Sequence, residues 1–331
     1  MSTNFPNGLE SYGVPLLGGN TLPKMGGQGK VFFVDPALGS DSNNGTSPES
    51  ALDTVAAAFA LCTDKKGDTV YLLNDGTTSG TSRDTAIVWN KSNTHLVGLC
   101  APAINARARI APPTTDATDV DAYTPYITIS GNGCVFANIS IFQGNSENTV
   151  PSVGLYVSGA RNYFQNVSVI TGAAANQGDE DDNYQVQITG EENVFEKCYI
   201  GQDTEPRGGG VGGNVYFGAG ASDQAARNIF RGCVFPMFAD NTDPVFVRVE
   251  TVSDIMRWNL FEGCTFINTG TSTIAAGVSV VAAPGGVLLF KDCGFHGCTN
   301  VTAADSTTVY CQGPAGNPSV DVGLFGGVDI A

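Results

Sequence analysis

Acidic residues gather at two places in this sequence where a cation could bind. Asp179–Asp182 is a run of four carboxylates, Asp-Glu-Asp-Asp, in a loop. Asp41, Asn43 and Gly45 have the alternate spacing with which a calcium loop begins, but the downstream ligands of such a loop are missing. Acidic runs in loops are usually solvated, with calcium or a basic partner as the alternative. We therefore expect no resident metal and no cofactor.

The other reactive side chains stand apart from one another. His95 and His296 have no nucleophile motif around them. Arg207 precedes a glycine-rich stretch, 208–213, which lacks the strand and the Lys-Ser/Thr pair of a phosphate loop and is expected to be flexible. No His or CxxC spacing that would suit a metal accompanies the four cysteines that share one repeat position, so we expect them to form a buried ladder of free thiols: Cys198, Cys233, Cys264 and Cys293.

A repeat of about 30 residues organises the chain. Asn193–Ile200, Asn228–Phe235 and Asn259–Phe266 share the pattern Asn-apolar-Phe-x-x-Cys-x-apolar, and weaker copies flank them. A fixed period in this range is typical of stacked repeats and not of a single globular core. The repeat phenylalanines are spaced 28, 31, 35, 31 and 29 residues apart: Phe136, Phe164, Phe195, Phe230, Phe261 and Phe290.

Each repeat contains three short strands and no stretch long enough for a crossover helix, which predicts a parallel β-helix. One strand contains the Phe and a second follows the Cys. A third strand lies upstream of the Phe, as in Tyr184–Ile188. A β-propeller is the alternative, but its blades need about 40–45 residues and four strands. The Phe and Cys strands are joined by a sharp two-residue bend, because most residues at its second position enter the left-handed region cheaply: Asn138, Asn166, Lys197, Gly232, Gly263 and Asp292.

Composition excludes several classes of function. The formal net charge of −16 argues against nucleic-acid binding. The amino terminus lacks the basic and apolar regions of a signal peptide, and no apolar run is long enough to span a membrane. We therefore expect neither a nucleic-acid nor a membrane partner.

The two ends of the chain differ from its repeats. Residues 1–29 are rich in Gly and Pro, which is typical of a disordered tail, yet they are too apolar for a solvated linker, which favours an extended docking arm. The β-helix is expected over 30–310, with a capping helix over about 51–62 that Ser50 begins. Residues 311–331 are expected to form a C-terminal cap or a docking tail. The contacts of the arm are expected to be its apolar residues: Phe5, Leu9, Tyr12, Val14, Leu16 and Leu17.

The opening of the repeat region resembles a known family. The segments that carry the likeness are Phe33–Asp35, Gly39–Asp41, Gly45–Pro48, Ala56–Ala58 and Gly67–Val70. They are similar to the start of right-handed, pectate-lyase-like parallel β-helix proteins, and the repeats over 127–295 agree with that family. The resemblance implies an all-β, right-handed, single-stranded parallel β-helix. The arm, Asn4–Pro15, is similar to the starts of structural proteins of tailed bacteriophage virions.

The outward strand positions lack the residues that enzymes of this family need. Lyases of the fold need calcium-binding carboxylates and a base, and hydrolases need paired carboxylates. The expected outward positions contain one charge and no carboxylate, so no catalytic residue is carried over and we expect no enzyme. These positions are Thr128, Gly154, Tyr156, Gln185, Gln187, Tyr216, Phe246, Arg248, Ser279 and Val281 upstream, and Ser140, Ser168, Tyr199, Val234, Thr265 and Gly294 on the last strand of each coil.

One outward stripe is apolar, because the residue before each repeat Phe must point away from the face that holds the Phe. Either loops or tails of this chain cover the stripe, or another subunit does. β-Helical virion proteins similar to this one often pack three solenoids side by side, so we expect a homotrimer. The expected subunit contacts are Val135, Tyr163, Val194, Ile229, Leu260 and Leu289.

Three functions remain open. The one we expect is a non-enzymatic bacteriophage virion protein, a capsid decoration or cement protein whose arm binds the major capsid protein or another virion protein in a particle assembled in the host cytoplasm. The second is a tailspike-like protein that binds or degrades a polysaccharide, with Tyr156, Tyr216 and Phe246 stacking on sugar rings. The third is a bacterial β-helix protein of unrelated role.

Overall fold

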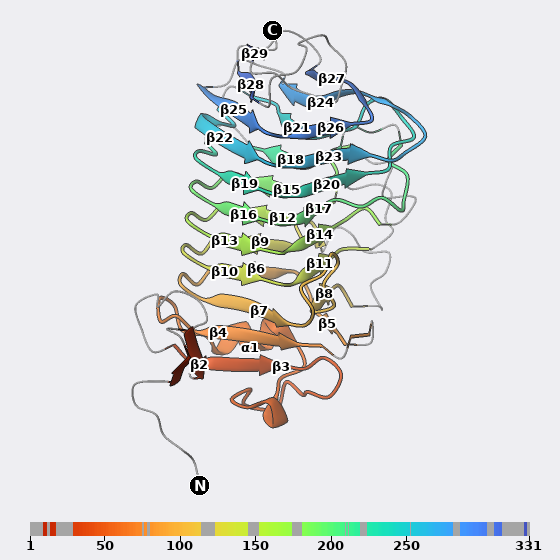
Figure 1. Cartoon of the computed structure of the whole chain (residues 1–331). Coiled ribbons are helices and arrows are strands. Elements are labelled where there is room, and N and C mark those ends of the chain that lie inside the picture. Colours follow the sequence, from red (N-terminus) through yellow and green to blue (C-terminus); the bar gives the residue numbers. More distant parts are fainter. Residues whose placement is uncertain are drawn as a thin grey trace.

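The chain coils into a right-handed parallel β-helix with about 31 residues per turn. In Figure 1 the coils stack along one axis, from red near the N-terminus to blue near the C-terminus. This computed structural model describes residues 9–11, 14–17, 29–74, 76–77, 80–113, 123–144, 152–173, 181–208, 210, 212–218, 224–251, 253–280, 285–302, 308–312 and 328–329.

Three sheets form the walls of the solenoid. Sheet I contains β3 (Val31–Val34), β4 (Thr69–Leu73), β7 (His95–Leu99), β10 (Val135–Ala137), β13 (Tyr163–Gln165), β16 (Val194–Glu196), β19 (Ile229–Arg231), β22 (Met256–Glu262), β25 (Gly285–Lys291), β28 (Val309–Gln312) and β29 (Val328–Asp329). Sheet II contains β5 (Thr81–Arg83), β8 (Arg109–Ala111), β11 (Ser140–Phe142), β14 (Ser168–Ile170), β17 (Tyr199–Ile200), β20 (Val234–Met237), β23 (Thr265–Asn268) and β26 (Gly294–His296). Sheet III contains β6 (Ile87–Trp89), β9 (Ile127–Ile129), β12 (Val153–Val157), β15 (Tyr184–Ile188), β18 (Gly213–Phe217), β21 (Val245–Val249), β24 (Ile274–Val280) and β27 (Cys298–Thr302).

The repeat phenylalanines form the predicted ladder inside sheet I. Each ring stacks on the next with centroids 4.3 to 5.1 Å apart and planes within 11° of parallel. Sheet II has a shorter ladder of Phe235, Phe266 and Phe295, stacked at 4.5 and 4.4 Å. Because every ring is almost fully buried, the two ladders form the core of the C-terminal coils.

The predicted bends between sheets I and II have left-handed backbones in all six coils. Their φ values lie between 50° and 61°, and Lys197, the least expected residue at this position, has φ 52°. Sheets III and I are joined by a second left-handed turn that the sequence did not predict. It places Arg161, Glu192 and Arg227 at φ 57° to 60° immediately before a buried Asn.

That buried Asn forms a second internal ladder, Asn162, Asn193, Asn228 and Asn259. The side-chain oxygen of each accepts the backbone N–H of a residue in the preceding coil, at 2.8 to 3.1 Å. Each side-chain amide in turn donates to a backbone carbonyl of the turn in the preceding coil. The ladder therefore satisfies backbone groups that the turn removes from the sheets.

The cysteine ladder is confirmed as free thiols. All nine cysteines of the chain are unpaired, and the four at the repeat position are buried. Each of these Sγ atoms lies 3.3 to 3.5 Å from the carbonyl oxygen of the repeat Phe one coil earlier. Parallel Cβ directions in stacked coils explain why neighbouring thiols do not pair.

The capping helix is shorter than predicted. Helix α1 spans Val55–Leu61, and Thr54, instead of Ser50, accepts the N–H of Ala57 as its N-cap. The helix does not begin at residue 51 because Leu52 forms a β-bridge with Val34. Residues 51–54, which follow the short 3-10 turn η1 (Pro48–Ser50), therefore have irregular backbone.

Sheet II holds the start of α1 in place. The N–H of Val55 donates to Ser82 Oγ at 3.1 Å, and the N–H of Ala56 donates to Asp84 Oδ1 at 2.8 Å. Burial raises the pKa of Asp84 to about 6. The cap and the first coils are therefore joined by a buried carboxyl group.

Both termini add short antiparallel pairs. β1 (Leu9–Ser11) and β2 (Val14–Leu17) form a hairpin that contains four of the predicted arm contacts, whereas Phe5 and Tyr12 lie outside the described residues. β28 extends sheet I to Gln312, and β29 pairs with it antiparallel. The division into arm, β-helix and C-terminal tail stays a prediction, as do the contacts of the arm. No helix in the described ranges is long and apolar enough to cross a membrane.

Candidate functional site

The outer face of sheet I carries the predicted apolar stripe. Its six members are paired in register from β10 to β25, so they form one continuous row. Val135 is buried, and the other five side chains are half-buried. Tyr310, 40% exposed, continues the row in β28. The register of the stripe is confirmed, and its role as a subunit contact stays a prediction.

A charged row lies two residues along from the apolar stripe. Glu262 accepts Arg231 Nε at 3.0 Å and Lys291 Nζ at 2.6 Å, and these two bonds lower its pKa. Glu196 accepts the hydroxyl of Tyr163 at 2.7 Å. Because these groups are exposed or half-buried, we expect salt to screen them.

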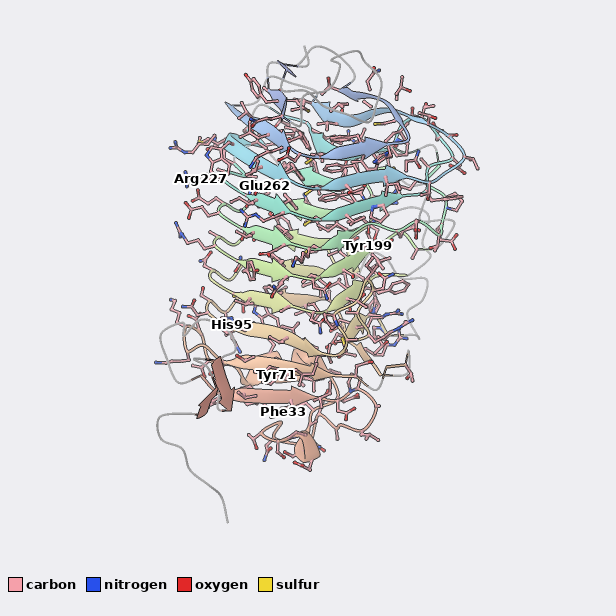
Figure 2. The ribbon with its side chains drawn as sticks, viewed as in Figure 1. Phe33, Tyr71, His95, Tyr199, Arg227 and Glu262 are labelled. Carbon is pink, nitrogen blue, oxygen red and sulfur yellow. The ribbon has the colours of Figure 1, made fainter. Side chains whose placement is uncertain are left out.

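Aromatic rings replace the charges of this row at its N-terminal end. Phe33 on β3 and Tyr71 on β4 have ring centroids 5.8 Å apart. In Figure 2 they lie at the opposite end of sheet I from Glu262. The row beside the apolar stripe therefore changes from aromatic to charged along the solenoid axis, while the stripe itself continues to Tyr310.

The outer face of sheet III holds a polar row with one arginine. Tyr156, Gln187, Tyr216 and Arg248 are aligned by strand pairing and are half-buried. Tyr156 is hydrogen-bonded to Thr189 at 3.0 Å. These four residues lie outward as the alternation predicted.

Carboxylates that the outward alternation did not include surround that arginine. Arg248 forms ion pairs with Asp182, at 3.2 Å, and with Glu250. Glu250 also accepts the hydroxyl of Tyr216 at 2.9 Å, and burial followed by this bond raises the pKa of Tyr216. The presence of Glu250 two residues after Arg248 was the available sequence signal. Each acid here has a partner, which favours a fixed polar network over a free acid or base.

The prediction that Gln185 and Phe246 point outward is wrong. Gln185 is fully buried and bonds both backbone groups of Thr171, at 2.6 and 3.1 Å. Phe246 is also fully buried, with its ring 5.6 Å from that of Phe266 in sheet II. Strand pairing skips this position in three successive coil pairs, so the strand bends there and alternation fails.

Other predicted outward positions in sheets II and III are also buried. Gly154, at the same skipped position as Gln185, is buried. Ser140 and Ser168 are buried as well, and the N–H of Asn105 donates to Ser168 Oγ at 3.1 Å. The chain between β7 and β8 therefore covers this part of sheet II, a contact across 63 residues that alternation cannot predict. Val281 lies outside the described residues. The remaining positions are half-buried: Thr128, Ser279, Tyr199, Val234, Thr265 and Gly294.

The two acidic groups have structural partners in the described part of the chain. Asp41 accepts the N–H groups of Asp53 and Thr54, both at 2.9 Å, and Asn43 donates to Ala51 O. In the acidic run, Asp182 pairs with Arg248, whereas positions 179 and 180 are not described. The described ranges contain no group of three or more His, Cys, Asp or Glu side chains placed to hold a metal.

The isolated basic residues have different surroundings. His95 is buried, its Nδ1 accepts the N–H of Val135 at 3.1 Å, and burial lowers its pKa. His296 is exposed. The flexible loop expected at Arg207 is wrong for that residue, because its guanidinium is buried and donates to Asn183 O at 3.0 Å. Burial lowers the pKa of Arg207 to about 10.

No family model matches the sequence, and no curated protein matches it. Solved structures do share its fold. The pectin methylesterase of Aspergillus niger, in deglycosylated form, is 13% identical with a TM-score of 0.53, and the match covers 93% of this chain and 92% of that enzyme. Pectate lyase Pel9A is 16% identical with a TM-score of 0.52, over 81% of this chain and 64% of the lyase. A rhamnogalacturonan lyase is 14% identical with a TM-score of 0.52, over 80% and 68% of the two chains.

The chain has the pectate-lyase-like β-helix fold. It spans about two thirds of the length of Pel9A and almost all of the A. niger enzyme. At identities of 13% to 16% the likeness concerns the fold alone, so no catalytic residue of these enzymes is placed on this chain. Its architecture is shared with β-helix proteins that act on polysaccharides.

Proposed function

We propose that this chain is a non-enzymatic structural protein of a bacteriophage virion, a capsid decoration protein anchored by its N-terminal arm and packed as a homotrimer. Its partner is the major capsid protein or another virion protein, in a particle assembled in the host cytoplasm. The observation that carries the proposal is the continuous apolar stripe on the outer face of sheet I. A row of this length on an outer wall suits a lateral contact with another long surface.

The size of the stripe limits what it can do alone. With Val135 buried and the other five residues half-buried, association removes roughly 200 Å² of apolar area, which is worth about 5 kcal/mol. Association itself costs about 4–15 kcal/mol. A stable trimer therefore also needs neighbouring apolar groups, and Phe33, Tyr71 and Tyr310 are placed along the same sheet to supply them.

The polar groups of the outer faces support a non-enzymatic role. Glu262 is held between Arg231 and Lys291, and Asp182 and Glu250 are held by Arg248. A general acid needs a pKa raised toward neutrality, and the pKa of Glu262 is lowered instead. These carboxylates are suited to fixing side chains in place.

Deletion of residues 1–29 tests the anchoring. The coils begin at β3, and in a solenoid each coil is stabilised by its neighbours, so circular dichroism should be unchanged. Capsids assembled with the truncated chain should lack it, as measured by its copy number per purified particle. Leu260→Glu in the full-length chain tests the stripe separately, because it keeps the arm and alters the proposed subunit contact. Wild-type occupancy by the truncated chain would mean that the arm is not the anchor.

The second candidate is a polysaccharide-binding or polysaccharide-degrading protein, favoured by Tyr156 and Tyr216 beside Arg248 on sheet III. Phe246, the third expected aromatic, is buried and unavailable to a sugar. Incubation with host polysaccharide, followed by assays for reducing and unsaturated ends, separates the candidates. New ends with the wild-type chain would favour degradation. Binding without cleavage that Tyr216→Ala abolishes would favour a glycan-binding protein.

A further inference from the structure

Three arginines gather at the N-terminal end of sheet II. Arg83 ends β5, Arg109 begins β8, and Arg107 lies two residues before Arg109. Burial lowers the pKa of Arg109, and the positive charges of Arg107 and Arg83 lower it further, so the three charges act on one another. None of the three forms an ion pair with a carboxylate in the part of the chain that the structure describes. This is unusual for a chain whose net charge is −16.

Several buried polar atoms without a hydrogen-bond partner belong to this part of the chain. Six buried side-chain atoms have no hydrogen-bond partner among the described residues, and four of them belong to Asn105, Arg109, Ser140 and Gln143. Arg109 and Ser140 are directly paired across β8 and β11. The backbone of Asn105 donates to Ser168, the partner of Ser140 in the next coil. These atoms are enclosed by the chain, so a ligand from the solvent can reach only the outer part of the Arg109 guanidinium.

The donors at this place suit an oxygen anion. Arg109 offers a planar fork that can bind both oxygens of a carboxylate, and Arg83 and Arg107 are exposed beside it. A −16 chain repels acidic ligands over most of its surface, so attraction of an anion must be local to such a cluster.

We propose that this arginine face, formed by Arg83, Arg107 and Arg109, binds carboxylate side chains of an acidic polypeptide segment. A polypeptide is favoured over an acidic glycan because the aromatic ring at this face is already occupied. The guanidinium of Arg109 lies 4.9 Å from the ring centroid of Phe142 and covers one face on which a sugar could stack. The face lies on sheet II, so the proposal is independent of the stripe on sheet I and of the arm.

Fluorescence anisotropy with a labelled oligoglutamate peptide tests the proposal on the full-length chain. The wild type should bind at low ionic strength and more weakly as salt is added. The double variant Arg83→Gln, Arg107→Gln changes two exposed residues and should bind about tenfold more weakly or worse, because it loses charge-assisted hydrogen bonds. The matched control is Arg161→Gln, Arg231→Gln, which makes the same change of net charge elsewhere and should bind like the wild type.

Competing polyanions decide the ligand class. Polygalacturonate should displace the peptide poorly. If polygalacturonate bound more tightly than the peptide, and if this binding depended on Arg83 and Arg107, the ligand of the face would be an acidic glycan and not a polypeptide. An equal loss of peptide affinity in both double variants would mean that binding depends on the net charge of the chain alone, and the proposed site would be wrong. Absence of wild-type binding to the peptide would also overturn it. None of these readings depends on whether the chain lacking residues 1–29 enters capsids.

Discussion

Replacement of one ladder asparagine, Asn193→Ala, should destabilise the coils on both sides of it. Asn193 is fully buried, and its Oδ1 accepts the N–H of Asn162 at 2.9 Å. Its Nδ2 donates to the carbonyl of Gly159 at 3.0 Å and to Oδ1 of Asn228 at 3.1 Å. The substitution removes all three bonds and leaves no side chain that could replace them.

The expected magnitude follows from the groups that lose their partners. Asn228 Oδ1 still accepts the backbone N–H of residue 193, at 2.9 Å, so it stays satisfied. The N–H of Asn162 and the carbonyl of Gly159 lose their bonds to the side chain. At about 1–3 kcal/mol for each of these two buried unsatisfied groups, the free energy of unfolding should fall by roughly 2–6 kcal/mol.

Two measurements check this expectation. Chemical denaturation gives the loss in the free energy of unfolding, and native-state hydrogen exchange should show at least about tenfold faster exchange in peptides that contain Asn162. Asn90→Ala is the matched control, since Asn90 is exposed and its substitution should change stability by less than about 0.5 kcal/mol. If the two variants were equally stable, the asparagine ladder would not be a source of stability, and the reasoning from its hydrogen bonds would be refuted.

Three further predictions concern other parts of the chain. Asp84 has its pKa raised to about 6 by burial, so its contribution to stability is present below the usual pKa of 3.8 and is lost as pH rises through 6. In thermal unfolding measured over a series of pH values, Asp84→Asn should abolish this loss of stability, which is at most about 3 kcal/mol. Alkylation of the denatured, unreduced chain should modify all nine cysteines, and a protected pair would contradict the free thiols. Leu260→Glu should convert a wild-type multimer to a monomer in light scattering with unchanged circular dichroism, and a monomeric wild type would mean that the stripe holds no subunit.

Much of the architecture could be predicted because it repeats. The period of the phenylalanines placed their ladder, and the small or polar residues at the bends predicted left-handed backbones, even at Lys197. Side-chain direction could be predicted only where a strand is regular. At Gln185 and Phe246 the strand bends, and the bend has no signature in the residue types. The burial of outward side chains beneath loops could not be predicted either, because the segment that covers Ser168 comes from a distant part of the sequence.

The polar groups of the site were harder to predict for a related reason. Strand alternation identified Arg248 as an outward charge, but its partner Asp182 lies 66 residues earlier, and the two meet only when three successive coils are stacked. The arginine face has the same origin, since Arg83 and Arg109 are separate in sequence and lie on adjacent strands of one sheet. A repeat predicts what recurs in every coil, whereas these charges occur in single coils.

The three outer faces present different chemistry, which bears on the choice between functions. Sheet I exposes an apolar stripe beside ion-paired charges, sheet III carries a satisfied polar network, and sheet II has arginines that lack acidic partners among the described residues. Here two walls carry features suited to two different surfaces, one apolar and one acidic. Because the walls face different directions, a single chain could contact both surfaces at once, which agrees with the proposed role in an assembly.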